Sequence, residues 1–176
     1  MNSAIVEIEL DRANLRRWRE GDEEALVRHA NNRKIWRNLS DAFPYPYTYL
    51  DAVDYIQKFI PASDGVILAI EVEGEAAGSI GLHFQPGLKH SAEIGYWLGE
   101  SHWRKGIVTE AVQTLTRYGF KELGLLRIFA RVFEWNAGSM RVLEKAGYSL
   151  EGRHRKAVIK DGQIIDELTY AVVRDG

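Results

Sequence analysis

The segment EIGYWLGESHWRKGIVTEAV, residues 93–112, contains residue types that can bind an anion and move a proton. Glu93 lies in an apolar, strand-like run that ends at Gly99, and Arg104, Lys105 and Gly106 precede a helical pattern. The first amides of a helix lack internal acceptors, and the helix dipole favours an anion at that end. The segment therefore predicts a phosphate or pyrophosphate site. The alternative is a solvent-exposed basic loop with a glycine turn.

A second polar motif, NAGS at residues 136–139, stands at the start of a short helical pattern. Asn136 suits the N-cap position, and Ser139 is expected in the first turn. By residue type alone, they are interpreted as a helix cap and a solvated serine. The nucleotide motifs G-x-x-x-x-G-K-[ST] and G-x-G-x-x-G are absent, so a P-loop or Rossmann site has no sequence support.

Three blocks of sequence together resemble one family. AEIGYWLGESHWRKGIVTEAV, EWNAGSMRVLEKAGY and FPYPYT are similar to the GNAT superfamily of N-acetyltransferases, in the branch with the ribosomal-protein N-terminal acetyltransferases RimJ and RimL. The similarity covers most of the chain from about Leu10 to the end. It implies a GNAT-like acyl-CoA N-acyltransferase fold, in which helices flank a central, mostly antiparallel twisted sheet. It also implies one N-acetyltransferase domain over residues 1–176.

The resemblance implies acetyl-coenzyme A (acetyl-CoA) as co-substrate and no metal. In the family's loop pattern Q/R-x-x-G-x-G/A, Trp103 takes the first place and Gly106 matches the glycine. Val108 stands where glycine or alanine is usual, and Arg104 where the branch commonly has glycine. The residues that would bind the coenzyme are Leu98, Trp103, Arg104, Lys105, Gly106, Ile107, Val108, Thr109, Asn136 and Ser139.

Acetyl transfer to an amine needs a neutral amine, a stabilised oxyanion and a proton for the leaving thiolate. The resemblance implies that Glu93 is the general base, and the alternative is a solvent-facing glutamate. Strand alternation places Glu93 on one face with Gly95 and Trp97, where partial enclosure would raise a glutamate pKa. Leu143 occupies the place of the tyrosine that many members use as acid, so Ser139 becomes the candidate acid.

Oxyanion stabilisation is expected from a backbone N–H of strand 93–98. That strand should splay from strand 126–133, so that pantetheine enters like an extra strand. Gly95 is compatible with a β-bulge and equally with a glycine packed under a ring.

The acceptor is expected to be a primary amine, either a protein N-terminal α-amine such as that of a ribosomal protein or a small amine, acetylated directly in a ternary complex. An α-amine has a pKa of about 7.7–8.0, so a larger fraction of it is neutral at pH 7 than of a lysine side chain, and it depends less on a general base. One wall of the acceptor cleft would contain Trp36, Arg37, Phe43, Tyr45, Tyr47 and Trp97. A core or rim role is the alternative for these aromatic residues.

Two other functions remain open. The second hypothesis is a catalytically weak sensor of the same fold that binds a CoA thioester, which Val108 and the missing tyrosine motivate. A phosphate-binding regulatory domain unrelated to acyl transfer is the third hypothesis.

Composition and charge limit the kinds of partner and binding site that are compatible with this chain. The 176 residues carry a net charge of -2 and no cysteine, which disfavours direct nucleic-acid binding and excludes disulfides and thiolate metal sites. His83 and His90 flank a turn without metal-ligand spacing. The basic run 153–156 is interpreted as a solvated strand face. No apolar run is long enough to span a membrane, and the N-terminus lacks a signal-peptide pattern, so we expect a cytoplasmic protein, compatible with a homodimer.

The elements that must position these residues follow from periodicity and turn signals. Their order predicts a mixed α+β or α/β sheet domain. The expected strands are 4–10, 14–18, 66–73, 76–84, 91–98, 126–133 and 164–173, the last returning from a type I′ hairpin at Asp161–Gly162. The expected helices are 22–31, a segment from the Thr48 cap that Pro61 ends, 107–121, and a short helix from Asn136 to Gly147.

Overall fold

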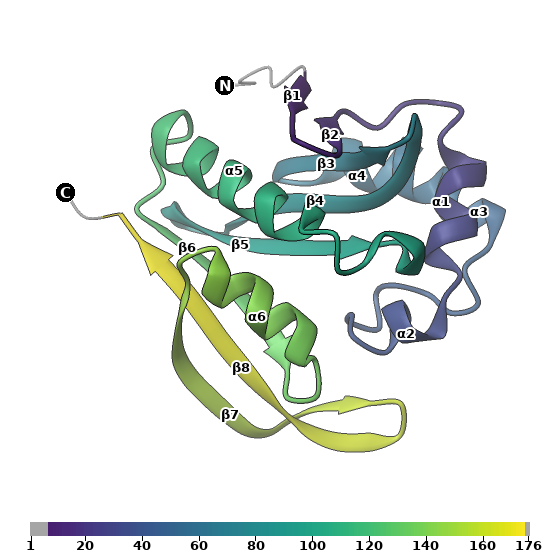
Figure 1. The fold of residues 1–176 in the computed structure, drawn as a ribbon. Coiled ribbons are helices and arrows are strands. Elements are labelled where there is room, and N and C mark those ends of the chain that lie inside the picture. The colour runs from purple at the N-terminus through teal and green to yellow at the C-terminus, as the bar shows by residue number, and fades with distance from the viewer. Residues whose placement is uncertain (1–6, 175–176) are drawn as a thin grey trace.

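The computed structural model describes residues 7–174, in which eight strands form a single sheet with helices on both faces (Figure 1). The strands are β1 Glu7–Glu9, β2 Asn14–Arg16, β3 Gly65–Val72, β4 Glu75–Gln85, β5 Leu88–Leu98, β6 Arg127–Phe133, β7 Ser149–Lys160 and β8 Gln163–Val173. The helices are α1 Glu23–Ala30, α2 Arg33–Trp36, α3 Tyr49–Asp54, the π-helical turn η1 Tyr55–Phe59, α4 Ile60–Ala62, the 3-10 turn η2 Glu100–His102, α5 Ile107–Lys121 and α6 Ala137–Lys145.

The sheet order is β1-β2-β3-β4-β5-β6-β8-β7, and β5 and β6 are the one parallel pair among the described strands. Helix α5 makes the crossover between them, as parallel neighbours require. The expected mostly antiparallel sheet with flanking helices is therefore confirmed.

Local signals placed most elements correctly. Helix α1 lies between Asp22 and Asn31, as predicted from the acidic residues of its first turn. At the β7–β8 turn, Asp161 and Gly162 both have positive φ, at 51° and 72°, which is the type I′ geometry. Residues 4–6 of the first expected strand lie outside the described residues.

Two details of the helical predictions are wrong. Pro61 does not end its helix, because α4 continues through it to Ala62. The π-helical turn η1 immediately before it changes the hydrogen-bond spacing, so that proline falls in a first-turn position, where its missing N–H costs little. Helix α2 was also not predicted. It begins because the Asn32 side chain accepts from the backbone N–H groups of Lys34 and Ile35.

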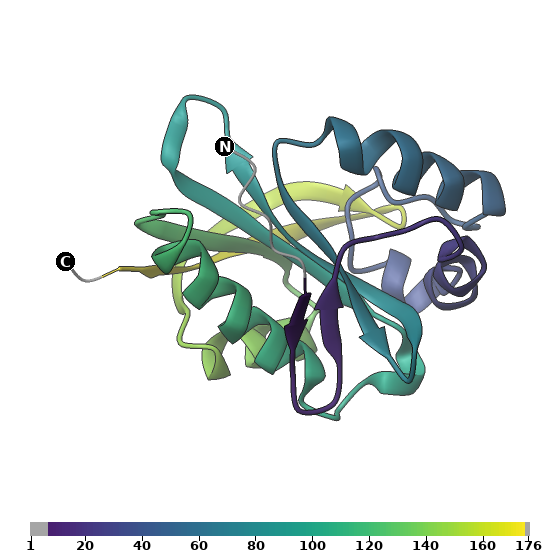
Figure 2. The ribbon, with the colours of Figure 1, turned by 90° about the horizontal axis from the view of Figure 1, so that it is seen from above.

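Two apolar clusters lie on opposite faces of the sheet. The larger one packs strand residues such as Ile94 and Leu98 against α5 and α6, while the smaller one joins α1 and α3 through Leu26 and Ala52 and contacts Trp97. Figure 2 shows α5 on one side of the sheet and the α3–α4 segment on the other. Strand β5 therefore contributes to both layers, and the alternation expected along it is present.

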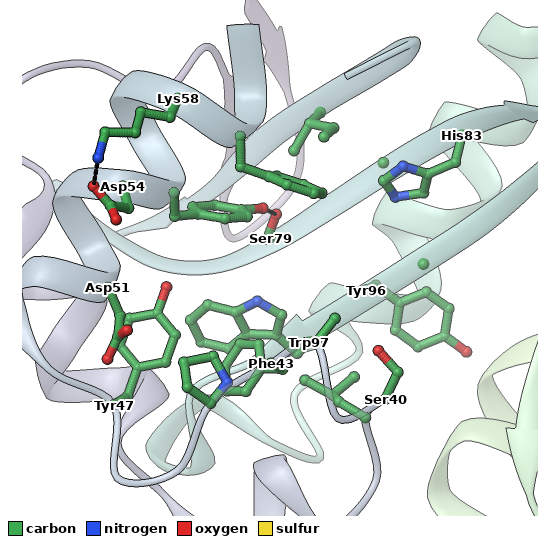
Figure 3. A pocket seen from close by; sticks show the side chains of 18 residues that line it. Ser40, Phe43, Tyr47, Asp51, Asp54, Lys58, Ser79, His83, Tyr96 and Trp97 are labelled. Carbon is green, nitrogen blue, oxygen red and sulfur yellow. Dashed lines mark hydrogen bonds and ion pairs between the residues drawn. The ribbon is translucent and has the colours of Figure 1, made fainter. Parts of the chain in front are cut away.

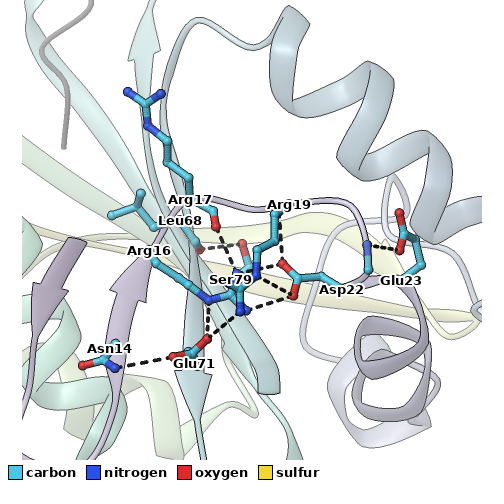
Figure 4. A network of polar contacts seen from close by, with 10 residues as sticks. Asn14, Arg16, Arg17, Arg19, Asp22, Glu23, Leu68, Glu71 and Ser79 are labelled. Carbon is cyan, nitrogen blue, oxygen red and sulfur yellow. Dashed lines mark hydrogen bonds and ion pairs between the residues drawn. The ribbon is translucent and has the colours of Figure 1, made fainter. Parts of the chain in front are cut away.

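A buried ion-pair network attaches the start of helix α1 to strands β2 and β3 (Figure 4). Arg16 is 5% exposed, and its guanidinium donates to both carboxylate oxygens of Asp22 at 2.8 and 2.9 Å and also to Glu71. Arg16 holds the pKa of Glu71 below its usual value. Because Asp22 is the N-cap residue of α1, this network sets where α1 begins relative to β2 and β3.

Candidate active site

Strands β5 and β6 pair over a short stretch and then separate. Their register runs from Ser91 opposite Arg127 to Glu93 opposite Phe129, although β5 continues to Leu98 and β6 to Phe133. In Figure 1 the two strands diverge beneath α5 and α6. The expected splay is present, and the β5 backbone beyond Glu93 is left without a partner strand on this side.

Tyr96 and Ser139 meet at this opening. The Tyr96 hydroxyl lies 2.7 Å from Ser139 Oγ, which joins β5 to the first turn of α6. Burial raises the pKa of Tyr96, so its hydroxyl remains protonated and able to donate. Leu143 is fully buried in the core, so its position offers no group to the site. A tyrosine hydroxyl is therefore present after all, but it comes from β5 instead of α6.

Asn136 acts as the predicted helix cap. Its Oδ1 accepts from the backbone N–H of Ser139 at 3.2 Å. This contact uses the carbonyl end of the amide and leaves the Nδ2 end for a ligand in the opening.

The loop after β5 presents backbone groups. Gly106 has φ 79° and precedes α5 without a side-chain cap, so the first-turn amides of Ile107, Val108 and Thr109 are left for a ligand. Trp103 Nε1 donates to Leu98 O at 2.7 Å and fastens the loop to the end of β5.

The two departures from the family pattern have structural explanations. Arg104 has φ 61°, a left-handed conformation that favours glycine, and its side chain is exposed. Val108 packs against the main core, so its branched side chain is accommodated there. The exposed cations Arg104 and Lys105, together with the uncapped amides, fit a pyrophosphate.

Glu93 is held by an arginine. Its two carboxylate oxygens accept from Arg131 Nε and Nη2 at 3.0 and 2.6 Å. This carboxylate raises the pKa of the Arg131 guanidinium. The partly enclosed face expected around Glu93 is present, but both oxygens are engaged by a cation. Its role as a base stays a prediction.

A cavity of about 690 Å³ opens on the face of the sheet that carries Trp97 (Figure 3). Its walls come from the 39–47 segment, α3, η1 and strands β3 to β5, and are mainly aromatic and aliphatic. The lining residues are Leu39, Ser40, Ala42, Phe43, Pro44, Tyr47, Asp51, Asp54, Tyr55, Lys58, Phe59, Ile67, Ser79, Gly81, His83, Gly95, Tyr96 and Trp97. Tyr96 belongs both to this cavity and to the contact with Ser139, so the cavity adjoins the strand opening.

The residues expected to form the acceptor wall divide into two groups. Phe43, Tyr47 and Trp97 line the cavity. Trp36, Arg37 and Tyr45 are not among its lining residues. Trp36 and Tyr45 have ring centroids 5.7 Å apart, and the Arg37 guanidinium lies 4.2 Å from the Trp135 ring centroid.

Trp36 takes part in a clamp on the β7–β8 hairpin. Lys160 is 1% exposed, its Nζ lies 3.9 Å from the Trp36 ring centroid, and it donates to Asp41 at 2.7 Å. These contacts fix the hairpin tip to the segment that continues into the cavity wall at Ala42 and Phe43. Trp36 and Lys160 thus support the wall from behind.

His83 was considered in the sequence only as a metal ligand, yet it lines the cavity. It stands opposite Glu93 in the β4–β5 register. Burial lowers the pKa of His83, and the opposing effect of Glu93 is smaller. Gly95 pairs with Gly81 without a bulge, and its position lies beside the His83 ring, so the ring-packing alternative for Gly95 is the observed one.

Two kinds of feature are not found within residues 7–174. No group of three or more His, Cys, Asp or Glu side chains could hold a metal ion. No helix there is long and apolar enough to cross a membrane.

Comparisons with known proteins agree with the resemblance. The family description "Acetyltransferase (GNAT) domain" matches residues 12–149. The Uncharacterized N-acetyltransferase YoaA of Bacillus subtilis is 33% identical over 172 residues, which covers 95% of this chain and 96% of that protein. The Ribosomal-protein-serine acetyltransferase of Escherichia coli is 33% identical over 103 residues, 58% of each chain.

Solved structures share the architecture. A GNAT-family acetyltransferase from Bacillus anthracis superposes with a TM-score of 0.84 at 28% identity, covering 96% of this chain and 98% of that one. The microcin C7 self-immunity acetyltransferase MccE, solved with acetyl-CoA and AMP, gives a TM-score of 0.80 at 27% identity over 94% of each chain. The chain therefore belongs to the GNAT acetyltransferase family.

Proposed function

Since the chain is an acetyl-CoA-dependent N-acetyltransferase of the GNAT family, we propose that its acceptor is a single primary amine carried by a largely apolar group. The observation that carries this proposal is the aromatic cavity that adjoins the Tyr96–Ser139 contact. Both a small aromatic amine and the N-terminal residue of a protein satisfy this description. The ribosomal-protein acetyltransferase among its relatives supports the second source.

The charges around the cavity argue against polycationic acceptors. Asp51 and Asp54 are its two lining carboxylates, and Lys58 is its one lining cation. Lys58 pairs with Asp54 at 2.6 Å, and Asp51 Oδ2 accepts from Thr48 N and Oγ1 at 2.7 and 2.6 Å. Polyamines and aminoglycosides carry several positive charges, which this nearly balanced rim would leave uncompensated. One ammonium group is compatible with it.

The apolar walls supply binding free energy for the acceptor's body. Phe43 and Trp97 lie with ring centroids 5.8 Å apart, and Tyr55 stacks on Phe59 at 5.5 Å. Tyr55 also makes a 2.9 Å hydrogen bond to Ser79, which fixes its ring. At about 25 cal/mol per Å² of buried apolar surface, covering a phenyl group contributes a few kcal/mol.

The coenzyme would be held by the loop and by the strand opening. When bound, acetyl-CoA supplies an acetyl group activated as a thioester. The amides of Ile107 and Val108, with Arg104 and Lys105, would face the pyrophosphate, and the free β5 edge and Asn136 Nδ2 would face the pantetheine arm. These residues would bind and orient the coenzyme, and the Tyr96–Ser139 pair would donate a proton at Ser139 Oγ.

Amine-dependent release of CoA thiol tests the proposal. The protein is mixed with acetyl-CoA and, separately, phenethylamine, a peptide with an N-terminal phenylalanine, spermidine, kanamycin or glycine. We expect thiol release and acetylated product with the first two and at least tenfold lower kcat/KM with the polycations. Binding of CoA without thiol release on any amine would instead favour a CoA-thioester sensor. Absence of CoA binding would favour the phosphate-binding domain. The cytoplasmic location and the homodimer stay predictions.

A further inference from the structure

His83 and Glu93 are cross-strand partners with different surroundings. The β4–β5 register pairs Ser79 with Trp97, Gly81 with Gly95 and His83 with Glu93, so these positions share one face of the sheet. His83 lines the cavity, whereas Glu93 does not and is bound by Arg131. The group that faces an acceptor in the cavity is therefore the imidazole.

Two glycines leave room for the His83 ring. A Cβ atom at Gly81 would lie 3.3 Å from His83 Nε2, and one at Gly95 would lie 3.8 Å from it. The Nε2 end of the ring therefore extends over both glycine positions. Figure 3 shows His83 and Tyr96 at the same end of the cavity.

His83 is also chemically available. Within the described part of the chain its ring nitrogens have no hydrogen-bond partner, so one can accept a proton. Burial lowers the pKa of His83, which keeps it neutral at neutral pH. The charged groups facing it are Glu93, neutralised by Arg131, and Asp51, Asp54 and Lys58 from across the cavity.

We propose that His83, in place of Glu93, is the general base that takes a proton from the acceptor's ammonium group, an inference that rests on the proposed function. The ammonium gives one proton to the imidazole, and the freed lone pair forms the C–N bond to the acetyl carbon. The C–S bond breaks, and the sulfur receives a proton from the Ser139–Tyr96 pair. The amine nitrogen then loses a second proton, which reprotonates the Ser139–Tyr96 pair through solvent. The imidazolium returns its proton to solvent, so one proton is released per acetyl group transferred.

Two acceptors of nearly equal shape test this role. Phenethylamine is protonated at pH 7, whereas O-benzylhydroxylamine is neutral there because its nitrogen is bonded to oxygen. We expect His83→Asn to lower kcat/KM for phenethylamine by about 100-fold and for O-benzylhydroxylamine by less than tenfold. Burial lowers the pKa of His83 below the ordinary histidine value of 6.5. With phenethylamine, wild-type kcat/KM should therefore fall as the pH drops through this lowered pKa. His83→Asn should lack this fall at acidic pH.

Matched variants separate this role from structural damage. His90→Asn changes an exposed histidine on the same hairpin and should leave both acceptors unaffected. The melting temperature and CoA affinity of His83→Asn should remain near those of the wild type. Equal losses with both acceptors, or no loss with either, would overturn the role of His83 while the transferase function stands. If the wild type acetylates neither amine, the proposed acceptor class fails, and the base assignment fails with it.

Discussion

The coenzyme loop presents backbone groups from one continuous segment, whereas the acceptor cavity presents side chains from distant parts of the chain. Gly106 and the first turn of α5 are contiguous, and their amides do not depend on side-chain identity. The cavity combines the 39–47 segment, α3 and η1 with the middle of the sheet. Coenzyme binding at this loop should therefore tolerate side-chain changes better than acceptor choice and proton transfer, which should depend on single side chains.

The largest effect is expected where the two regions meet. Tyr96→Phe removes the hydroxyl that contacts Ser139 and should lower kcat by about 100-fold with little change in either KM, because proton donation typically contributes 10²–10⁴-fold. Steady-state kinetics with acetyl-CoA and phenethylamine measure this.

Tyr148→Phe is the matched control for Tyr96→Phe. Tyr148 forms a buried hydroxyl pair of the same 2.7 Å length with Thr116, but it does not line the cavity. Its variant should change stability alone. If both variants lose kcat equally, the Tyr96–Ser139 contact has no special part in proton transfer.

A backbone change should affect the coenzyme side alone. Gly106→Ala places a Cβ in open space at φ 79°, so its cost comes from the left-handed backbone, about 1–2 kcal/mol. This strain displaces the loop amides, so KM for acetyl-CoA should rise about tenfold without changing acceptor preference.

Gly124→Ala is the control for the glycine variant. Gly124 has φ 67° and equally open space, but it lies beyond the other end of α5. It should lower the melting temperature while KM for acetyl-CoA is retained. An altered acceptor preference in Gly106→Ala would contradict the separation of the two regions.

A side-chain change should affect the acceptor side alone. Phe59 is 52% exposed and stacks on Tyr55 at the cavity wall, so Phe59→Ala removes contact area with modest loss of stability. We expect KM for phenethylamine to rise about fivefold, corresponding to about 1 kcal/mol of apolar contact, with KM for acetyl-CoA unchanged. Leu126→Ala, an equally exposed position outside the cavity, provides the comparison. The assignment of the cavity to the acceptor fails if KM for acetyl-CoA is the constant that rises.

The smallest effect should come from behind the cavity wall. Lys160→Met keeps the apolar stem but removes the contacts to Asp41 and the Trp36 ring. Because Asp41 is itself exposed, little uncompensated charge remains, and we expect a two- to threefold rise in acceptor KM, about 0.5 kcal/mol. Lys89→Met, at an exposed position, should be neutral. Identical kinetics for the two variants would show that the clamp does not position the wall.

The sequence was most informative where the relevant residues are neighbours. The α1 boundaries, the Asp161–Gly162 turn and the Asn136 cap each follow from a few adjacent residues. The coenzyme loop could be predicted for the same reason, because a helix start and a glycine are features of adjacent residues.

The acceptor side could not be predicted in this way. Arg131 is 38 residues from Glu93 and Ser139 is 43 residues from Tyr96, and no local pattern links them. Strand alternation placed Tyr96 on the core face, but its pairing with α6 depends on the separation of β5 from β6. His83 lacks metal-ligand neighbours in sequence, and the role proposed for it depends on its place in the cavity and on the two glycines beside its ring.

A crystal structure of the protein with CoA and N-acetylphenethylamine would locate the coenzyme and the acceptor relative to each other in one measurement. We expect the thiol sulfur between β5 and β6, within hydrogen-bond distance of Ser139 Oγ or Tyr96 OH. We also expect the phenyl group in the aromatic cavity and the amide nitrogen within hydrogen-bond distance of His83 Nε2. A product bound outside the cavity, with the thiol still at the strand opening, would contradict this placement of the acceptor.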